Sequence, residues 1–225
     1  MTIDRHQTVG AIAVEHPAAT RVFARHGIDY CCGGGAPLNE VCGANSLDPE
    51  QILAEIDREL ADRDAPATRW NDRPLDELIE HILSTYHRSL WEELPRLGSM
   101  AVKVREVHHD KAPAMLSELV STFASLRSEL EEHMQKEEQI LFPMIRAGQG
   151  AFAEGPIGCM EEEHERAGSA LARLRELTHD YEVPEEACTT WRALWHGLAE
   201  LEASLHEHIH LENNILFPRA LASRS

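Results

Sequence analysis

The pattern His-x-x-x-Glu-x-x-Ile-Leu-Phe-Pro occurs twice in this chain and constrains the fold more than any other feature of the sequence. The first copy begins at His133 and the second at His208, 75 residues later. A weaker match, offset by 77 residues, aligns His87 with His164. The repeated unit is therefore a helix with one His followed by a helix with His-x-x-x-Glu. A helical hairpin that occurs twice in succession predicts a four-helix bundle.

Apolar residues recur with a period near 3.6 from Leu75 onward, and no alternating strand pattern competes with this period. The predicted fold class is all-α, with a small helical N-terminal domain before an up-down four-helix bundle. The predicted boundaries are the N-terminal domain over 1–62, a polar linker with two prolines over 63–74, and the bundle over 75–225. Pro143 and Pro218 are expected to kink or end their helices.

Short helices are predicted in the N-terminal domain over 9–14, 18–26 and 49–60. Between the second and third of these helices, consecutive glycines at 33–35 predict an irregular segment.

The charge and the cysteine usage exclude several classes of protein. Lys and Arg number 21 against 39 Asp and Glu, a net charge of −18, which argues against binding to nucleic acid or to an anionic membrane. The sequence has no apolar run of about 18 residues, so no membrane span is expected. The N-terminus lacks the apolar stretch of a signal peptide, and the five cysteines form no disulfide framework. These features predict a cytoplasmic protein.

Six polar side chains share the apolar faces of the four bundle helices. Burying several carboxylates is very costly unless a positive charge lies between them, and a pair of metal ions supplies that charge. His and Glu four residues apart on one helix can reach the same cation, and mixed imidazole and carboxylate ligation suits iron or manganese better than structural zinc. The predicted metal ligands are His87, His133, Glu137, His164, His208 and Glu212.

Glu129 and Glu163 are placed on the inward faces beside these ligands. Either they hydrogen-bond the ligand imidazoles and orient them, or they line a polar path for protons, iron or a diatomic gas.

The vicinal pair Cys31–Cys32 lies on the glycine-rich segment and is the second candidate site. Adjacent cysteines form only a strained, easily reduced ring, so the pair is either a redox or metal-handling site or two buried small residues. The role of Cys42 is open. Cys159 and Cys188 are expected to pack, and His206, His210 and His108 are expected at the surface.

The sequence resembles the repair of iron centres (RIC) family of bacterial, hemerythrin-like di-iron proteins over nearly its whole length. The motifs that carry the resemblance are DYCCGG at 29–34, YH at 86–87, HMQKEEQILFPMI at 133–145, EEHERAG at 162–168 and HIHLENNILFPRAL at 208–221. The resemblance implies two iron ions with an oxo or hydroxo bridge. It places the iron ligands on the four His named above and the bridging carboxylates on Glu137 and Glu212. It also supports the polar path and a metal-handling role for the vicinal thiols.

Two other di-iron classes fit less well. Ferritin-like sites need Glu-x-x-His on two helices, and among the candidate metal-binding His residues only His164 has a Glu, Glu161, three residues before it. Oxygen-carrying hemerythrins have a fifth His at the position of Gly168. With one imidazole ligand fewer, the iron is expected to be more open and less tightly held than in an oxygen carrier.

The resemblance implies repair of iron–sulfur clusters damaged by nitrosative or oxidative stress, with iron donation as the expected route and the damaged proteins as partners. The alternative is nitric oxide binding or reduction at the di-iron centre, and oxygen sensing or carriage ranks lower. A metal-handling repair protein is expected rather than an enzyme, and only nitric oxide reduction would make the protein an enzyme. A homodimer is left open.

Overall fold

The computed structural model describes residues 3–61 and 68–223. Across those two ranges the regular elements are helical, and the β-type pairing is limited to an isolated bridge between Thr8 and Pro37. The all-α prediction is confirmed. The chain divides into two compact units, Met1–Leu78 with His206–Ser225 and Ile79–Leu205.

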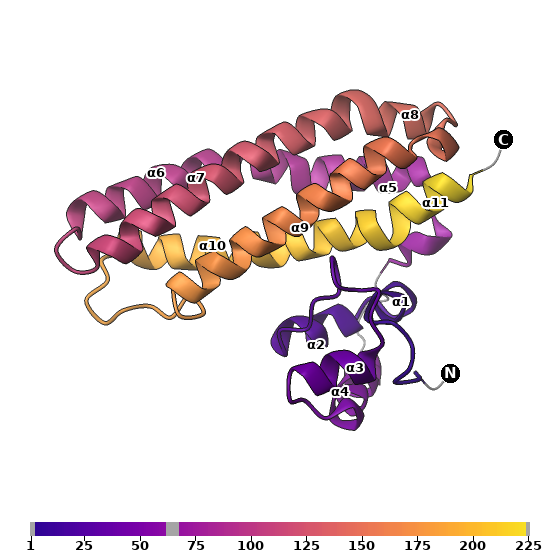
Figure 1. The fold of residues 1–225 in the computed structure, drawn as a ribbon, viewed down its shortest axis with the longest axis horizontal. Helices are drawn as coiled ribbons and strands as arrows, with labels where there is room; N and C mark the ends of the chain where they lie inside the picture. The colour runs from indigo at the N-terminus through magenta and orange to yellow at the C-terminus, as the bar shows by residue number, and fades with distance from the viewer. Residues whose placement is uncertain (1–2, 62–67, 224–225) are drawn as a thin grey trace. The chain divides into compact units, whose positions relative to one another are not determined.

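Figure 1 shows the helices in chain order. The α-helices are α1 (Val9–Glu15), α2 (Ala19–Arg25), α3 (Leu38–Ala44), α4 (Pro49–Ala61), α5 (Leu75–His81), α6 (Arg88–Val107), α7 (Pro113–Lys136), α8 (Phe142–Arg146), α9 (Glu154–Leu177), α10 (Thr189–Leu211) and α11 (Phe217–Ala222). Short 3-10 turns are formed by Trp70–Asp72 and Gly150–Phe152, and π-helical turns by Ile82–His87, Glu137–Leu141 and Glu212–Leu216.

The N-terminal helices α1–α4 enclose a small apolar core of their own. Phe23, Leu38 and Ile56 belong to this core and are fully buried. The helix α3 differs from the prediction, because the segment that contains it was expected to be irregular. The three glycines end before Pro37, and the apolar residues Leu38, Val41 and Cys42 then follow at helical spacing, so a helical turn forms where the glycines stop.

In the second unit, α6, α7, α9 and α10 as far as Leu205 pack around one apolar core (Figure 1). Each helix contributes an apolar stripe, and Trp191 and Trp195 are the largest fully buried side chains. The short connection before α7 ends in Pro113 at the first helical position, where a missing backbone N–H costs nothing. The four-helix bundle predicted from the repeat is therefore present.

Both copies of Ile-Leu-Phe-Pro adopt the same local structure. In each copy a π-helical turn ends at the Leu, and the following α-helix begins at Phe142 or Phe217 with the proline as its second residue. Because proline lacks an N–H and crowds the preceding turn, a widened turn before it removes the conflict. The prolines therefore mark a change of helical geometry.

Each π-helical turn has a candidate metal ligand at one end. His87 ends the first turn, Glu137 begins the second and Glu212 begins the third. Single π-helical turns inside α-helices often occur at functional sites, because they re-aim side chains.

The predicted domain boundaries stay predictions. Part of the proposed linker, 63–67, lies outside the described residues, and Trp70–Asp72 forms a single 3-10 turn before α5. Among the helices of the described ranges, none has the length and apolar character needed to cross a membrane.

Candidate metal centre

The six candidate ligands are buried, and the structure brings them into two groups of four. The first group is His87, Glu137, His208 and Glu212, and the second is His133, Glu137, His164 and Glu212. Within each group the nitrogen and oxygen atoms lie within 4.8 Å of one another. The two groups share both carboxylates, and each adds its own pair of imidazoles.

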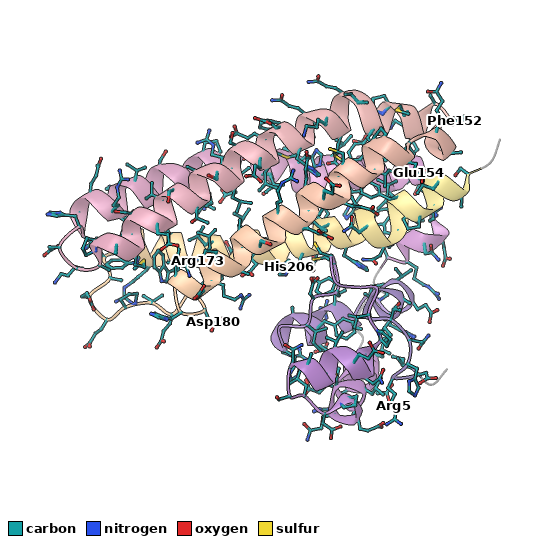
Figure 2. The ribbon with its side chains drawn as sticks, in the orientation of Figure 1. Arg5, Phe152, Glu154, Arg173, Asp180 and His206 are labelled. Atoms are coloured by element: carbon teal, nitrogen blue, oxygen red, sulfur yellow. The ribbon has the colours of Figure 1, made fainter. Side chains whose placement is uncertain are left out.

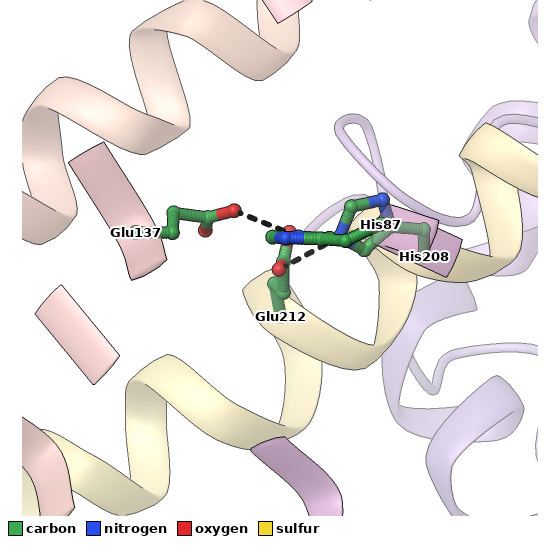
Figure 3. A group of neighbouring side chains, drawn as sticks. All are labelled: His87, Glu137, His208 and Glu212. Carbon is green, nitrogen blue, oxygen red and sulfur yellow. Dashed lines mark hydrogen bonds and ion pairs between the residues drawn. The ribbon is translucent and has the colours of Figure 1, made fainter. Parts of the chain in front are cut away.

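Figure 3 shows the first group, with contacts from Glu137 to His87 and from His208 to Glu212. Nε2 of His87 lies 3.3 Å from Oε2 of Glu137, and Nε2 of His133 lies 3.3 Å from the same oxygen. One carboxylate oxygen of Glu137 therefore faces one imidazole from each group.

The opposite nitrogens of these imidazoles are held by carboxylates. His87 Nδ1 lies 2.9 Å from Glu138 Oε1, and His133 Nδ1 lies 3.0 Å from Glu163 Oε2. An Nδ1–H that donates to a carboxylate leaves the Nε2 lone pair for a metal ion, which is the usual arrangement of a ligand histidine. Both rings therefore present Nε2 to the interior.

The remaining imidazoles also converge. His164 Nε2 lies 3.1 Å from His133 Nε2, and their ring centroids are 4.7 Å apart. His208 Nε2 lies 2.9 Å from Glu212 Oε1, one helical turn away. Nitrogen atoms facing each other this closely, beside two fully buried carboxylates, suit a cluster organised around cations.

The donor set fits a pair of iron ions. Four imidazoles and two carboxylates are intermediate in softness, which suits iron and provides no thiolate cage of the kind typical of structural zinc. Two carboxylates common to both groups can bridge two neighbouring ions, and two imidazoles complete each end.

Glu163 and Glu129 occupy different environments, although the sequence placed both on inward faces. The Glu163 side chain is 12% exposed, and its Oε1 lies 2.5 Å from Lys136 Nζ. Burial raises the pKa of Glu163, but hydrogen bonds from Lys136 and His133 outweigh burial and leave the pKa below its ordinary value. The Glu163 carboxylate is thus favoured in its ionised form and lies beside Nδ1 of His133.

The expectation for Glu129 was wrong, since its side chain is 51% exposed and pairs with Arg166 on the surface. Glu129 is eight residues before Glu137, and eight residues leave it about 80° around the helix from that ligand, so it lies outside the face that His133 and Glu137 share. Glu129 lines an open groove between α7 and α9.

Sequence reasoning missed Glu138, which directly follows Glu137 and holds His87. The indole Nε1 of Trp91 donates to the same carboxylate oxygen at 3.3 Å. The sequence contains a weak signal for this role, because an acidic residue beside a ligand often orients a neighbouring imidazole.

The Cys31–Cys32 loop is built around the carboxylate of Asp29. Its Oδ1 accepts the backbone N–H of Cys31 and of Cys32 at 2.9 and 3.0 Å, and its Oδ2 accepts that of Gly33 at 2.9 Å. Both thiols are free, with Cys31 buried and Cys32 partly exposed, and their sulfur atoms are 3.8 Å apart. The hydrogen bond to Cys32 and burial raise the pKa of Cys31. Asp29, Cys31 and Cys32 form a third group whose ligand atoms could hold a metal ion.

The π-helical turn that begins at Glu212 is hydrogen-bonded to the Cys31–Cys32 loop. Asn213 Nδ2 donates to the carbonyl of Cys31 at 3.2 Å, and Asn214 Nδ2 donates to the carbonyl of Tyr30 at 3.1 Å. The ring of Tyr30 packs edge-on against His210 at 5.5 Å. His210 is therefore buried rather than on the surface as expected, and burial lowers its pKa to about 4.

Two further expectations about cysteines were wrong. Cys159 and Cys188 are exposed rather than packed. Cys159 lies near Glu163, and Cys188 lies just before α10. Cys42 is buried in the N-terminal core, where burial raises its pKa.

A four-helix bundle with paired His and His-x-x-x-Glu helices around shared carboxylates defines the hemerythrin-like class of cation-binding proteins. In agreement, the hemerythrin HHE cation binding domain matches residues 78–220, and ScdA_N, a domain of unknown function, matches residues 5–60.

The chain is also similar along nearly its whole length to proteins named "Iron-sulfur cluster repair protein YtfE". It is 44% identical over 217 residues to the protein of Pectobacterium carotovorum, covering 96% of this chain and 97% of that protein. It is 45% identical over 218 residues to the Escherichia coli O8 protein, covering 97% and 98%. The chain therefore belongs to the family that these proteins represent, and the predicted resemblance is confirmed.

Proposed function

We propose that this protein repairs iron–sulfur clusters damaged by nitrosative or oxidative stress, and that it does so by donating iron. The observation that carries the proposal is the sharing of Glu137 and Glu212 by both groups of ligands. Two ions that depend on the same two carboxylates are coupled, so weakening one carboxylate contact loosens both.

In this proposal the six buried residues hold the iron that is delivered. His87, His133, His164 and His208 would bind the iron through imidazole nitrogen, and Glu137 and Glu212 would supply the carboxylates common to both groups. Bound iron would supply redox chemistry, while Glu138 and Glu163 would fix the orientation of two of the imidazoles.

Cys31 and Cys32 are the proposed acceptor or electron source. Their loop is hydrogen-bonded to Asn213 and Asn214, immediately after Glu212. With Asp29 they offer two soft ligands and one hard ligand within reach of a single ion. Glu129, which is exposed, is proposed only for the outer part of a polar path.

We place this activity in the cytoplasm, with damaged iron–sulfur proteins as partners. All five cysteines are free, which supports a reducing compartment. A homodimer stays a prediction.

The test is anaerobic iron transfer. Reduced, iron-loaded protein is mixed with a cluster enzyme that has lost one iron, in the presence of a chelator, and recovery of that enzyme's activity is followed. Recovery should scale with the added protein and be lost in Glu137→Ala. The control is Glu132→Ala, an exposed position on the same helix. Failure of the wild-type protein to restore activity while it keeps its iron would contradict donation.

Nitric oxide binding or reduction is the second candidate. Each group offers two imidazoles and two carboxylates, which leaves room at each ion for a small exogenous ligand. Catalytic consumption of nitric oxide by the reduced protein, without transfer of iron, would favour this function over donation.

A further inference from the structure

His108 and Cys188 form a close pair at one end of the bundle. His108 Nε2 lies 3.2 Å from Cys188 Sγ, although 80 residues separate them in sequence. Figure 2 labels Asp180 in the α9–α10 connection that leads to Cys188, and Phe152 just before the opposite end of α9. His87 precedes α6 and His108 follows it, so about 30 Å of helix lies between the pair and that candidate metal ligand.

The two residues occupy helix ends of opposite polarity. His108 caps the C-terminus of α6, where its backbone N–H donates to the carbonyl of Val104. Cys188 is the N-cap of α10, because its carbonyl accepts the N–H of Arg192 at 3.0 Å. The α6 C-terminus favours a cation and the α10 N-terminus favours an anion. The two helix ends therefore both favour transfer of the proton from Cys188 to His108, because this transfer leaves a cation at the first end and an anion at the second.

Neighbouring contacts hold the pair in place. The ring of His108 packs against the buried ring of Trp191, with centroids 4.8 Å apart. Arg192 donates to the carbonyls of Ala187 and Glu185 at 2.9 and 3.1 Å, which fixes the segment before Cys188. The pair is thus pre-organised and still open to solvent on the sulfur side.

Cys188 differs from the other thiols of the chain. Hydrogen bonds from His108 and from the backbone N–H groups of Trp191 and Thr190 lower its pKa to about 7. Burial and the nearby Glu163 raise the pKa of Cys159, the other exposed thiol. The charged side chains just before Cys188, Glu185 and Glu186, are exposed to solvent.

We propose that His108 and Cys188 are a nucleophilic pair that reacts with low-molecular-weight disulfides, so that Cys188 becomes S-thiolated. His108 takes the thiol proton, and the Cys188 thiolate attacks one sulfur of the disulfide. A new S–S bond forms while the original S–S bond breaks, and the departing thiolate leaves with the electron pair and receives the proton from His108. Cys188 is oxidised to a mixed disulfide and the departing half is reduced to a thiol.

The test uses the full iron-loaded chain and glutathione disulfide at pH 7, with site-resolved mass spectrometry of the trapped protein. Cys188 should acquire the glutathionyl group about tenfold faster than Cys159, because more of it is thiolate. In the wild type the rate at Cys188 should rise with a midpoint near pH 7. In His108→Gln the midpoint should move toward the ordinary thiol value of about 8.5.

Three variants separate chemistry from packing. His108→Gln should lower the rate of glutathionylation at Cys188 several-fold. The rate at Cys159 should stay unchanged, which also shows that the fold is intact. His108→Phe keeps a ring against Trp191 and should be equally slow. His109→Gln, which alters the exposed neighbour, should match the wild type. Equal rates at Cys188 and Cys159, or a Cys188 rate unaffected by both His108 variants, would overturn the proposal.

Discussion

His133 on α7 and Glu163 on α9 are joined by a 3.0 Å contact between Nδ1 and Oε2, and this contact sets which nitrogen of the imidazole faces the buried cluster. Lys136 holds the other oxygen of the same carboxylate. A partly exposed ammonium, a mostly buried carboxylate and a buried imidazole thus form a chain from the surface to the candidate metal centre.

Replacing Glu163 should weaken metal binding without removing a ligand. In Glu163→Ala the imidazole loses the acceptor that orients it, and iron affinity should fall by about 10–100-fold. Competition against a chelator measures this loss. Glu162→Ala, at the exposed preceding position, should bind iron as the wild type does. Equal losses in both variants would mean that general charge, rather than orientation, is responsible.

Removing the metal should destabilise the protein. Without a cation, the carboxylates of Glu137 and Glu212 are buried in the same cluster with no metal ion between them, which is unfavourable. Metal at a free concentration 100 times its Kd stabilises the fold by about 2.7 kcal/mol, which corresponds to a Tm rise of about 5–10 °C. Calorimetry of the iron-loaded and chelator-treated protein measures the difference. In Glu137→Ala iron should no longer shift Tm, whereas Glu132→Ala should keep the shift.

The Cys31–Cys32 loop should loosen when Gly34 gains a side chain. A Cβ at Gly34 would lie 2.8 Å from the carbonyl of Tyr30 and 3.1 Å from Cα of Gly10, both backbone atoms that cannot move away cheaply. Gly34→Ala should therefore expose Cys31 and raise its rate of alkylation several-fold.

The matched control is Gly35→Ala, because a Cβ there meets nothing within 4 Å. Alkylation of Cys31 that stays slow in Gly34→Ala would show that the loop tolerates the added methyl group.

Replacement of two helical glycines by alanine should change the stability of the protein in opposite directions. A Cβ at Gly197 would lie 2.6 Å from Cδ2 of the buried Leu97, whereas a Cβ at Gly158 meets nothing within 4 Å. Gly158→Ala should stabilise by about 0.5–1 kcal/mol through helix propensity. In Gly197→Ala, overpacking of about 1–3 kcal/mol should exceed that gain and lower Tm. A rise of Tm in both variants would contradict the close packing of α6 against α10 at this level.

The sequence by itself determined the helical class, the repeated hairpin and the six buried polar positions. These follow from periodicity, since a residue's place on a helix face depends only on its spacing from the apolar residues of the same helix. His133 and Glu137 could be placed on one face without knowing what lies opposite. The proline-marked repeat likewise predicted that two segments share one local structure.

Only the tertiary structure decided the contacts that cross between elements. Glu129 and Glu163 looked equivalent from spacing alone, but Arg166 holds the first at the surface while Lys136 and His133 hold the second beside the cluster. His210 is buried because Tyr30 packs on it, and Cys188 is activated because His108, 80 residues earlier, lies 3.2 Å away. A helix period fixes the direction in which a side chain leaves its own helix. The burial, charge state and reactivity of that side chain depend on the neighbour it meets, which is set by how distant segments pack.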